Sequence, residues 1–206
     1  MNTLGKTLFL VQFAVLLAIE ALFCFTPLGS IPIGPLVATL MMVPVIVTAI
    51  MLGTLAGTVM GFMAGLFSFL VWTFMPPAPP MAFLFTPFYS FGDFHGNFGS
   101  LLICFAPRTL AGTFTGLAYK GFMNLFKQKS IPSMFLAAVI GSVTNTVGVL
   151  GGIWAFFGEQ YTALAGAAIL AIIGATVLTN GLPEAAVNAV VAPAVCRPLK
   201  TVIKKI

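Results

Sequence analysis

Charged side chains are scarce in this sequence. Only 6% of the 206 residues are charged, with nine basic and four acidic side chains, whereas about a quarter is usual for a soluble domain. Three long stretches, residues 7–19, 21–92 and 131–158, contain no charged residue. Because 60% of the residues are hydrophobic, a folded chain cannot present a water-soluble surface. We therefore expect an integral membrane protein.

The sequence also lacks the groups that most enzymes use. Its one histidine, His95, has no cysteine or carboxylate pair beside it, and its three cysteines are widely spaced within apolar segments. We expect no catalytic residue, no metal site, no disulfide framework and no cofactor. A complete phosphate-binding loop is missing as well, because Gly5-Lys6-Thr7 has no upstream glycine at the required spacing. The chain is expected neither to be an enzyme nor to hydrolyse ATP.

Hydrophobic segments predict six transmembrane helices, since about 20 helical residues cross a bilayer. We expect them near residues 8–25, 36–52, 55–75, 97–120, 131–157 and 163–195. Segment 26–35, with three prolines and two glycines, is expected to be a loop, and 75–97 a longer loop rich in proline and aromatic residues. Pro183 is expected to kink the last helix. Together these segments predict one all-α domain over residues 1–206, a bundle of six membrane helices.

The basic residues indicate the orientation of this bundle. In the predicted topology they gather on one side, as Lys6, Lys120, Lys127, Lys129, Arg197, Lys200, Lys204 and Lys205. The positive-inside rule then places both the N-terminus and the C-terminus in the cytoplasm. The net charge of +5 is explained by these helix ends and by contact with lipid, so we expect no nucleic acid partner.

One helix carries a periodic pattern of glycine. Gly53, Gly57, Gly61 and Gly65 recur every fourth residue, which places them along one face of the helix predicted at 55–75. A face without side chains lets another helix approach closely. We interpret this ridge as a packing surface within the bundle.

A few polar residues lie inside the predicted helices, where burial in lipid is unfavourable. Arg108 falls near the middle of its helix; it either pairs with an acid such as Glu20 or receives the carboxylate of a substrate. Asn145, with Thr144 beside it, and Asn180 offer amide and hydroxyl groups in the next two helices. These groups either bind a ligand or form hydrogen bonds between helices.

Three stretches of the chain resemble the substrate-binding S-components of energy-coupling factor vitamin transporters. They are PLGSIPIGPLVATLMMVPVIVTAIMLGTLAGTVMGFMAGLFS, ICFAPRTLAGTFTGLAYK, and the pair GSVTNTVGVLGGIW with TNGLPEAAVNAVVAP. The resemblance implies a six-helix protein of the bacterial plasma membrane that binds a vitamin with high affinity from outside. It also implies partners, namely a transmembrane coupling subunit and two cytoplasmic ATPase subunits. Within the family the chain is most similar to the pantothenate and riboflavin-like branch, with pantothenate favoured.

The same resemblance implies roles for particular residues. An Ala-x-x-x-Ala face on the first helix docks the coupling subunit in this family, and Ala14 and Ala18 match it here. The family's ligand pocket opens outward between the first and third loops and the last three helices, a region that holds Arg108, Asn145 and Asn180 in this sequence.

Two alternatives stay open at this point. The ligand is another vitamin, riboflavin or a cobalamin, if the aromatic residues of segment 75–97 build the pocket. The chain is instead a self-sufficient secondary transporter if Glu20 or Glu184 binds a coupling ion.

Overall fold

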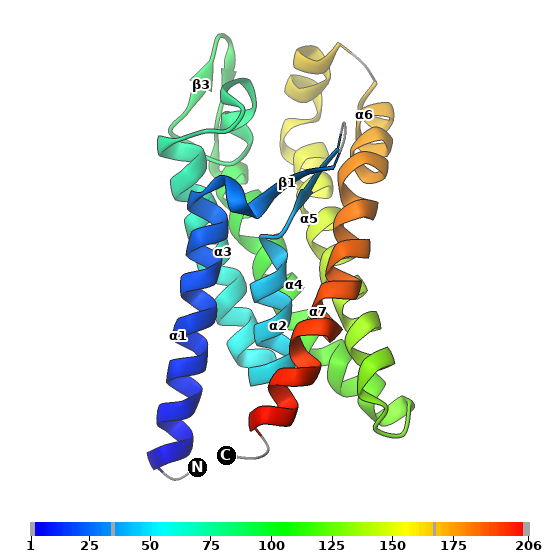
Figure 1. Cartoon of the computed structure of the whole chain (residues 1–206). Helices are drawn as coiled ribbons and strands as arrows, with labels where there is room; N and C mark the ends of the chain where they lie inside the picture. Colours follow the sequence, from blue (N-terminus) through cyan, green and yellow to red (C-terminus); the bar gives the residue numbers. More distant parts are fainter. Residues whose placement is uncertain (1–2, 34–35, 167, 204–206) are drawn as a thin grey trace.

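The computed structural model describes residues 3–33, 36–166 and 168–203, which fold into an elongated bundle of helices (Figure 1). The helices are α1 (Thr3–Phe25), α2 (Met42–Leu52), α3 (Thr54–Phe74), α4 (Phe98–Leu125), α5 (Ser130–Ala165), α6 (Ile169–Thr176) and α7 (Leu182–Ile203). Five helical stretches of the described residues are long and apolar enough to cross a membrane, and α2 is a shorter apolar helix. The prediction of an all-α membrane bundle is confirmed.

The first loop differs from its prediction. Residues 36–39 were expected to begin a helix, but they form strand β2 (Leu36–Thr39), which pairs with β1 (Ser30–Ile33) in an antiparallel hairpin. A short apolar strand and a helical turn look alike in hydropathy. Pairing between the two strands also satisfies their main-chain hydrogen bonds, as a helix would. The hairpin crosses one end of the bundle from α1 toward α6 (Figure 1).

The last predicted helix, 163–195, is also divided in the structure. Helix α5 runs on to Ala165, and Gly166 ends it in the left-handed conformation with φ 65°. Between α6 and α7 lies η3 (Val177–Gly181), a π-helical turn whose wider spacing lets the Leu182 N–H donate to the Val177 carbonyl. Pro183 has no N–H to continue the α-helical pattern, so the helix changes geometry in the turn before it.

Helix α2 forms the centre of the bundle. All residues from 42 to 50 are buried, because α1, α3, α4 and α7 all pack against this helix. The turn from α2 into α3 is a single residue, Gly53, whose φ of 98° is accessible to glycine and strained for residues with a Cβ. Gly53 therefore forms the turn between α2 and α3 and does not belong to the packing ridge.

The other three glycines of the predicted ridge do pack against a neighbouring helix. A Cβ on Gly57 would lie 2.9 Å from the Gly112 carbonyl oxygen of α4, and a Cβ on Gly65 would lie 3.1 Å from the Cα of Phe105. Gly61 lies against the main chain of Arg108. The close contact of α3 with α4 therefore depends on glycine, and it positions the arginine.

The two ends of the bundle differ. The start of α1, the turn from α4 to α5 and the end of α7 lie at one end (Figure 1), and this end carries the described basic residues apart from Arg108, which lies in the middle of α4. Segment 75–97 covers the other end with η2 (Pro79–Leu84), β3 (Ser90–Phe91) and β4 (Phe94–His95). Phe83 and Leu84 are buried there against Ile103, Ile153 and Phe157, so this loop is packed onto the helices.

Candidate functional site

A cavity of about 250 Å³ lies inside the bundle and contains most of the predicted binding residues. Helix α4 contributes Arg108, α5 contributes Asn145, and the π-helical turn η3 contributes Asn180. These residues are far apart in the sequence, and the fold brings them to one place. We call this space the Arg108 cavity.

Arg108 is held by its own helix on one side of the cavity. Its Nη1 donates a 2.7 Å hydrogen bond to the carbonyl of Cys104, one turn earlier. A guanidinium has five N–H donors, and this hydrogen bond occupies one of them. The half-buried guanidinium thus keeps donors for a carboxylate in the cavity.

The alternative role of Arg108, a structural pair with Glu20, is not supported by a direct contact among the described residues. Glu20 on α1 is completely buried. Its Oε1 accepts a 3.4 Å hydrogen bond from Cys24 Sγ, and its Oε2 has no hydrogen-bond partner among the described residues. The two side chains therefore form no direct hydrogen bond or ion pair with each other in the part of the chain that is described.

The two asparagines predicted to bind a ligand line the cavity, whereas the predicted threonine, Thr144, does not. Asn145 Oδ1 is buried and accepts no hydrogen bond within the described residues, so it is available to a donor on a ligand. Asn180 Nδ2 donates to Thr179 Oγ1 at 2.9 Å. Thr144 donates to the Ile140 carbonyl at 2.7 Å and is not among the described residues that line the cavity, whereas Thr146 is.

Aromatic residues form a second wall that the sequence reasoning missed. Trp72 of α3 and Phe85, which follows η2, stack with ring centroids 4.6 Å apart and an interplanar angle of 22°. Both line the Arg108 cavity, as does Ser68, one turn before Trp72. Ser68 is a polar residue within an apolar helix, and that signal was available in the sequence. The cavity thus combines one cation, one acid (Glu184), several amide and hydroxyl groups, and an aromatic face.

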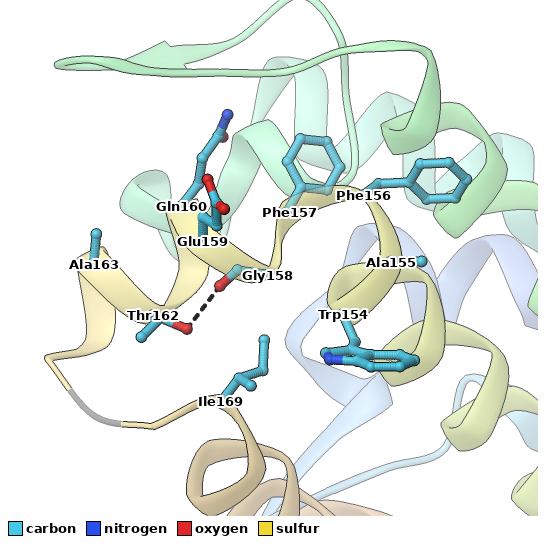
Figure 2. Close-up of a pocket in the computed structure, with 10 residues that line it drawn as sticks. All are labelled: Trp154, Ala155, Phe156, Phe157, Gly158, Glu159, Gln160, Thr162, Ala163 and Ile169. Carbon is cyan, nitrogen blue, oxygen red and sulfur yellow. Dashed lines mark hydrogen bonds between the residues drawn. The ribbon is translucent and has the colours of Figure 1, made fainter.

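A larger hollow of about 810 Å³ lies at the C-terminal end of α5. Figure 2 shows its lining where α5 leaves helical geometry at Phe157, with Trp154 and Ile169 on one side of the chain and Gln160 on the other. Its described lining residues include the exposed acid Glu159 and no basic residue. Among its described lining residues this hollow has no cation to pair with an anion, so the smaller Arg108 cavity is the stronger candidate for an anionic ligand.

The two alanines predicted to dock a partner lie on the surface of α1. Ala14 and Ala18 are exposed, whereas Phe13, Leu16 and Leu17 of the same helix pack against the core. The exposed face is therefore smooth at the two positions where another helix is expected to approach.

The sequence is similar to a known protein family and to a known transporter. A family model described as "ECF transporter, substrate-specific component" matches residues 8–196. The chain is also similar to the pantothenic acid transporter PanT of Lactococcus lactis subsp. cremoris (strain MG1363). It is 35% identical to that protein over 162 residues, which cover 78% of this chain and 76% of the relative.

Proposed function

Because the chain belongs to the substrate-specific components of energy-coupling factor (ECF) transporters, we propose that it binds pantothenate for import into the cell. Family membership makes it a multi-pass protein of the cell membrane and a transport subunit in vitamin uptake, not an enzyme. The observation that carries the choice of pantothenate is the meeting of Arg108, Asn145 and Asn180 in one cavity. The similarity to a pantothenic acid transporter supports the same choice.

The chemistry of pantothenate matches these groups. The molecule has a carboxylate at one end, an amide in the middle and two hydroxyls at the other end. Arg108 would receive the carboxylate in a charge-assisted pair, while Asn145 Oδ1 would accept a hydrogen bond from the ligand's amide or hydroxyl groups. Thr146, Thr176 and Asn180, which also line the cavity, supply further hydrogen-bonding groups.

Riboflavin is the second candidate, because the Trp72 and Phe85 stack would suit a flat aromatic ring. The size of the cavity argues against it. About 250 Å³ lies below the range of about 300–1,000 Å³ usual for pockets that hold drug-sized ligands. The same comparison disfavours a cobalamin, which is larger still. Riboflavin also lacks a carboxylate that could pair with Arg108.

The proposed transport cycle needs partners. Substrate-specific components act with a coupling module that contains ATPase subunits, so the self-sufficient secondary transporter considered from the sequence receives no support. We assign docking on the membrane coupling subunit to the exposed Ala14 and Ala18. We also place both termini in the cytoplasm, since the basic residues gather at the end of the bundle where α1 begins and α7 ends.

The test is a titration of the purified chain, in detergent or nanodiscs, with each B vitamin, in which calorimetry measures binding. Pantothenate is expected to bind with the highest affinity, and pantothenyl alcohol, which lacks the carboxylate, much more weakly. Tight binding of riboflavin without binding of pantothenate would contradict the proposal. Uptake by this chain alone in ATP-free proteoliposomes, driven by an ion gradient, would contradict the dependence on partners.

A further inference from the structure

A second polar cavity lies at the basic end of the bundle. It has a volume of about 490 Å³ and lies between the end of α4, the turn into α5 and the end of α7, which Figure 1 shows at that end. It shares no described lining residue with the Arg108 cavity. Most of its lining side chains are polar: Tyr119, Gln128, Ser130, Arg197, Lys200 and Thr201. We call this space the Lys200 cavity.

Lys200 is held in place within this cavity. Its Nζ donates a 2.6 Å hydrogen bond to the Tyr119 hydroxyl of α4 and lies 4.3 Å from the centroid of the Tyr119 ring. An ammonium group has three N–H donors, and this hydrogen bond occupies one of them. The helix that carries Lys200 is fixed as well, because Cys196, one turn earlier, is buried in the core. The ammonium group is therefore positioned in advance and keeps donors for an anion.

The positive charge in the Lys200 cavity is not balanced by an acid. Arg197 adds a second cation, and none of the described lining residues is acidic. The four acidic residues of the chain lie on α1, in segment 75–97, near the C-terminal end of α5 and at the start of α7, as Glu20, Asp93, Glu159 and Glu184. Two cations that share one cavity repel each other unless an anion lies between them. The described side chains supply no such anion.

We propose that the Lys200 cavity binds the phosphate group of an anionic phospholipid. A guanidinium pairs with two phosphate oxygens at once, and a lysine ammonium binds phosphate as a point charge. Basic pockets between membrane helices bind anionic lipid headgroups in this way. This inference goes beyond the proposed function and does not depend on which vitamin the Arg108 cavity binds.

An apolar surface beside the cavity favours a lipid over a soluble phosphate. Ser130 lines the cavity at the start of α5, and exposed apolar residues follow it on one face of that helix: Ile131, Phe135, Val143 and Val147. Their spacing of four or eight residues places them in a row along the helix. A phospholipid whose phosphate lies in the cavity would pack an acyl chain against this row. A soluble phosphate would make no use of it.

The experiment measures lipid binding to the full chain in detergent by native mass spectrometry. The chain is titrated with phosphatidylglycerol, with phosphatidylcholine of the same acyl chains, and with sn-glycerol 3-phosphate, which has none. The wild type is expected to bind phosphatidylglycerol most tightly, and to keep this preference at high ammonium acetate concentration, where attraction by exposed charges is screened. Arg197→Gln with Lys200→Gln should weaken phosphatidylglycerol binding by roughly ten- to hundredfold and leave phosphatidylcholine binding unchanged.

Lys120→Gln with Lys129→Gln is the matched control. It removes two exposed lysines from the same end of the bundle, and neither lines the cavity in the described structure. This variant is expected to keep the wild-type preference. Equal losses in the two double variants would overturn the inference, since only the overall charge of this end would then matter. Equal wild-type affinity for phosphatidylcholine or for glycerol phosphate would overturn it as well.

Two further outcomes keep the test decisive. If the variant at Arg197 and Lys200 does not fold, Tyr119→Phe takes its place. It retains the ring but removes the hydrogen-bond acceptor of Lys200, so phosphatidylglycerol binding should weaken, and unchanged binding would overturn the inference. An acidic protein partner is the alternative occupant. Unchanged phosphatidylglycerol binding in the Arg197 and Lys200 variant, together with loss of ATP-dependent uptake with the coupling subunits, would assign the cavity to a partner and overturn the inference.

Discussion

Gly61 of α3 lies directly against the main chain of Arg108 on α4. A Cβ placed on Gly61 would overlap the Arg108 carbonyl oxygen and would lie 2.9 Å from the Cα of Thr109. The absence of a side chain at one position of α3 thus determines how deeply α4 sits in the bundle, and with it the position of the guanidinium that faces the cavity.

Gly61→Ala is therefore expected to weaken ligand binding although Gly61 does not line the cavity in the described structure. The added methyl group should push α4 away from α3 and so move Arg108. The overpacking should lower the free energy of unfolding by about 1–3 kcal/mol. Thermal unfolding and calorimetric binding measure the two effects. Gly121→Ala on α4 is the control, because a Cβ there meets nothing within 4 Å. Unchanged affinity in Gly61→Ala would show that the glycine contact does not position Arg108.

Arg108→Gln tests the charge of the cavity. The glutamine retains hydrogen-bond donors but loses the cation, so pantothenate affinity should decrease by about 1.5–3 kcal/mol, the usual range for a hydrogen bond to a charged group. That change is roughly ten- to hundredfold in the dissociation constant. The weak binding of pantothenyl alcohol should change little. Arg197→Gln, at the exposed end of α7, should bind as the wild type does. Equal pantothenate affinity in Arg108→Gln would remove this residue from the site.

The proposed docking face is tested by Ala14→Leu with Ala18→Leu. Both side chains are exposed on α1, so the larger residues should leave folding and pantothenate binding unchanged. Close helix approach needs small residues, and ATP-dependent uptake with the coupling subunits should therefore be lost. Ala171→Leu on α6, which lies away from α1 (Figure 1), is the control. Normal uptake by the double variant would refute the docking role.

The stacking of Trp72 on Phe85 in the cavity wall predicts that the effects of these two residues on ligand binding are coupled. Trp72 and Phe85 stack at 4.6 Å, and each holds the other in place beside the ligand. In a double-mutant cycle with Trp72→Leu and Phe85→Leu, the coupling energy for pantothenate binding should be about 0.5–1.5 kcal/mol. The stacked pair Phe122 and Phe126, near the opposite end of α4, should give no coupling in the same measurement. Additive effects at Trp72 and Phe85 would mean that their contact does not shape the site.

Much of the architecture was predictable because hydropathy and glycine spacing are local signals. The predicted helices at 8–25, 55–75 and 97–120 correspond to α1, α3 and α4 within a few residues, apart from longer ends on α1 and α4. The family resemblance drawn from three sequence stretches is confirmed by the match over residues 8–196. The β1–β2 hairpin and the π-helical turn before Pro183 were missed, because both depend on main-chain hydrogen bonding that hydropathy does not encode.

The composition of this sequence by itself determined that the protein lies in a membrane, because so few charged groups cannot cover a water-soluble surface. The rarity of polar residues in lipid also singled out Arg108, Asn145 and Asn180 as candidate binding residues. The tertiary structure alone decided that these three side chains face one cavity, that Thr146 lines it in place of Thr144, and that Trp72 and Phe85 complete it. The physical reason is that a site between helices depends on how deeply and at what rotation each helix packs. In this protein that depth is determined by contacts such as Gly61 with Arg108, which join positions far apart in the sequence.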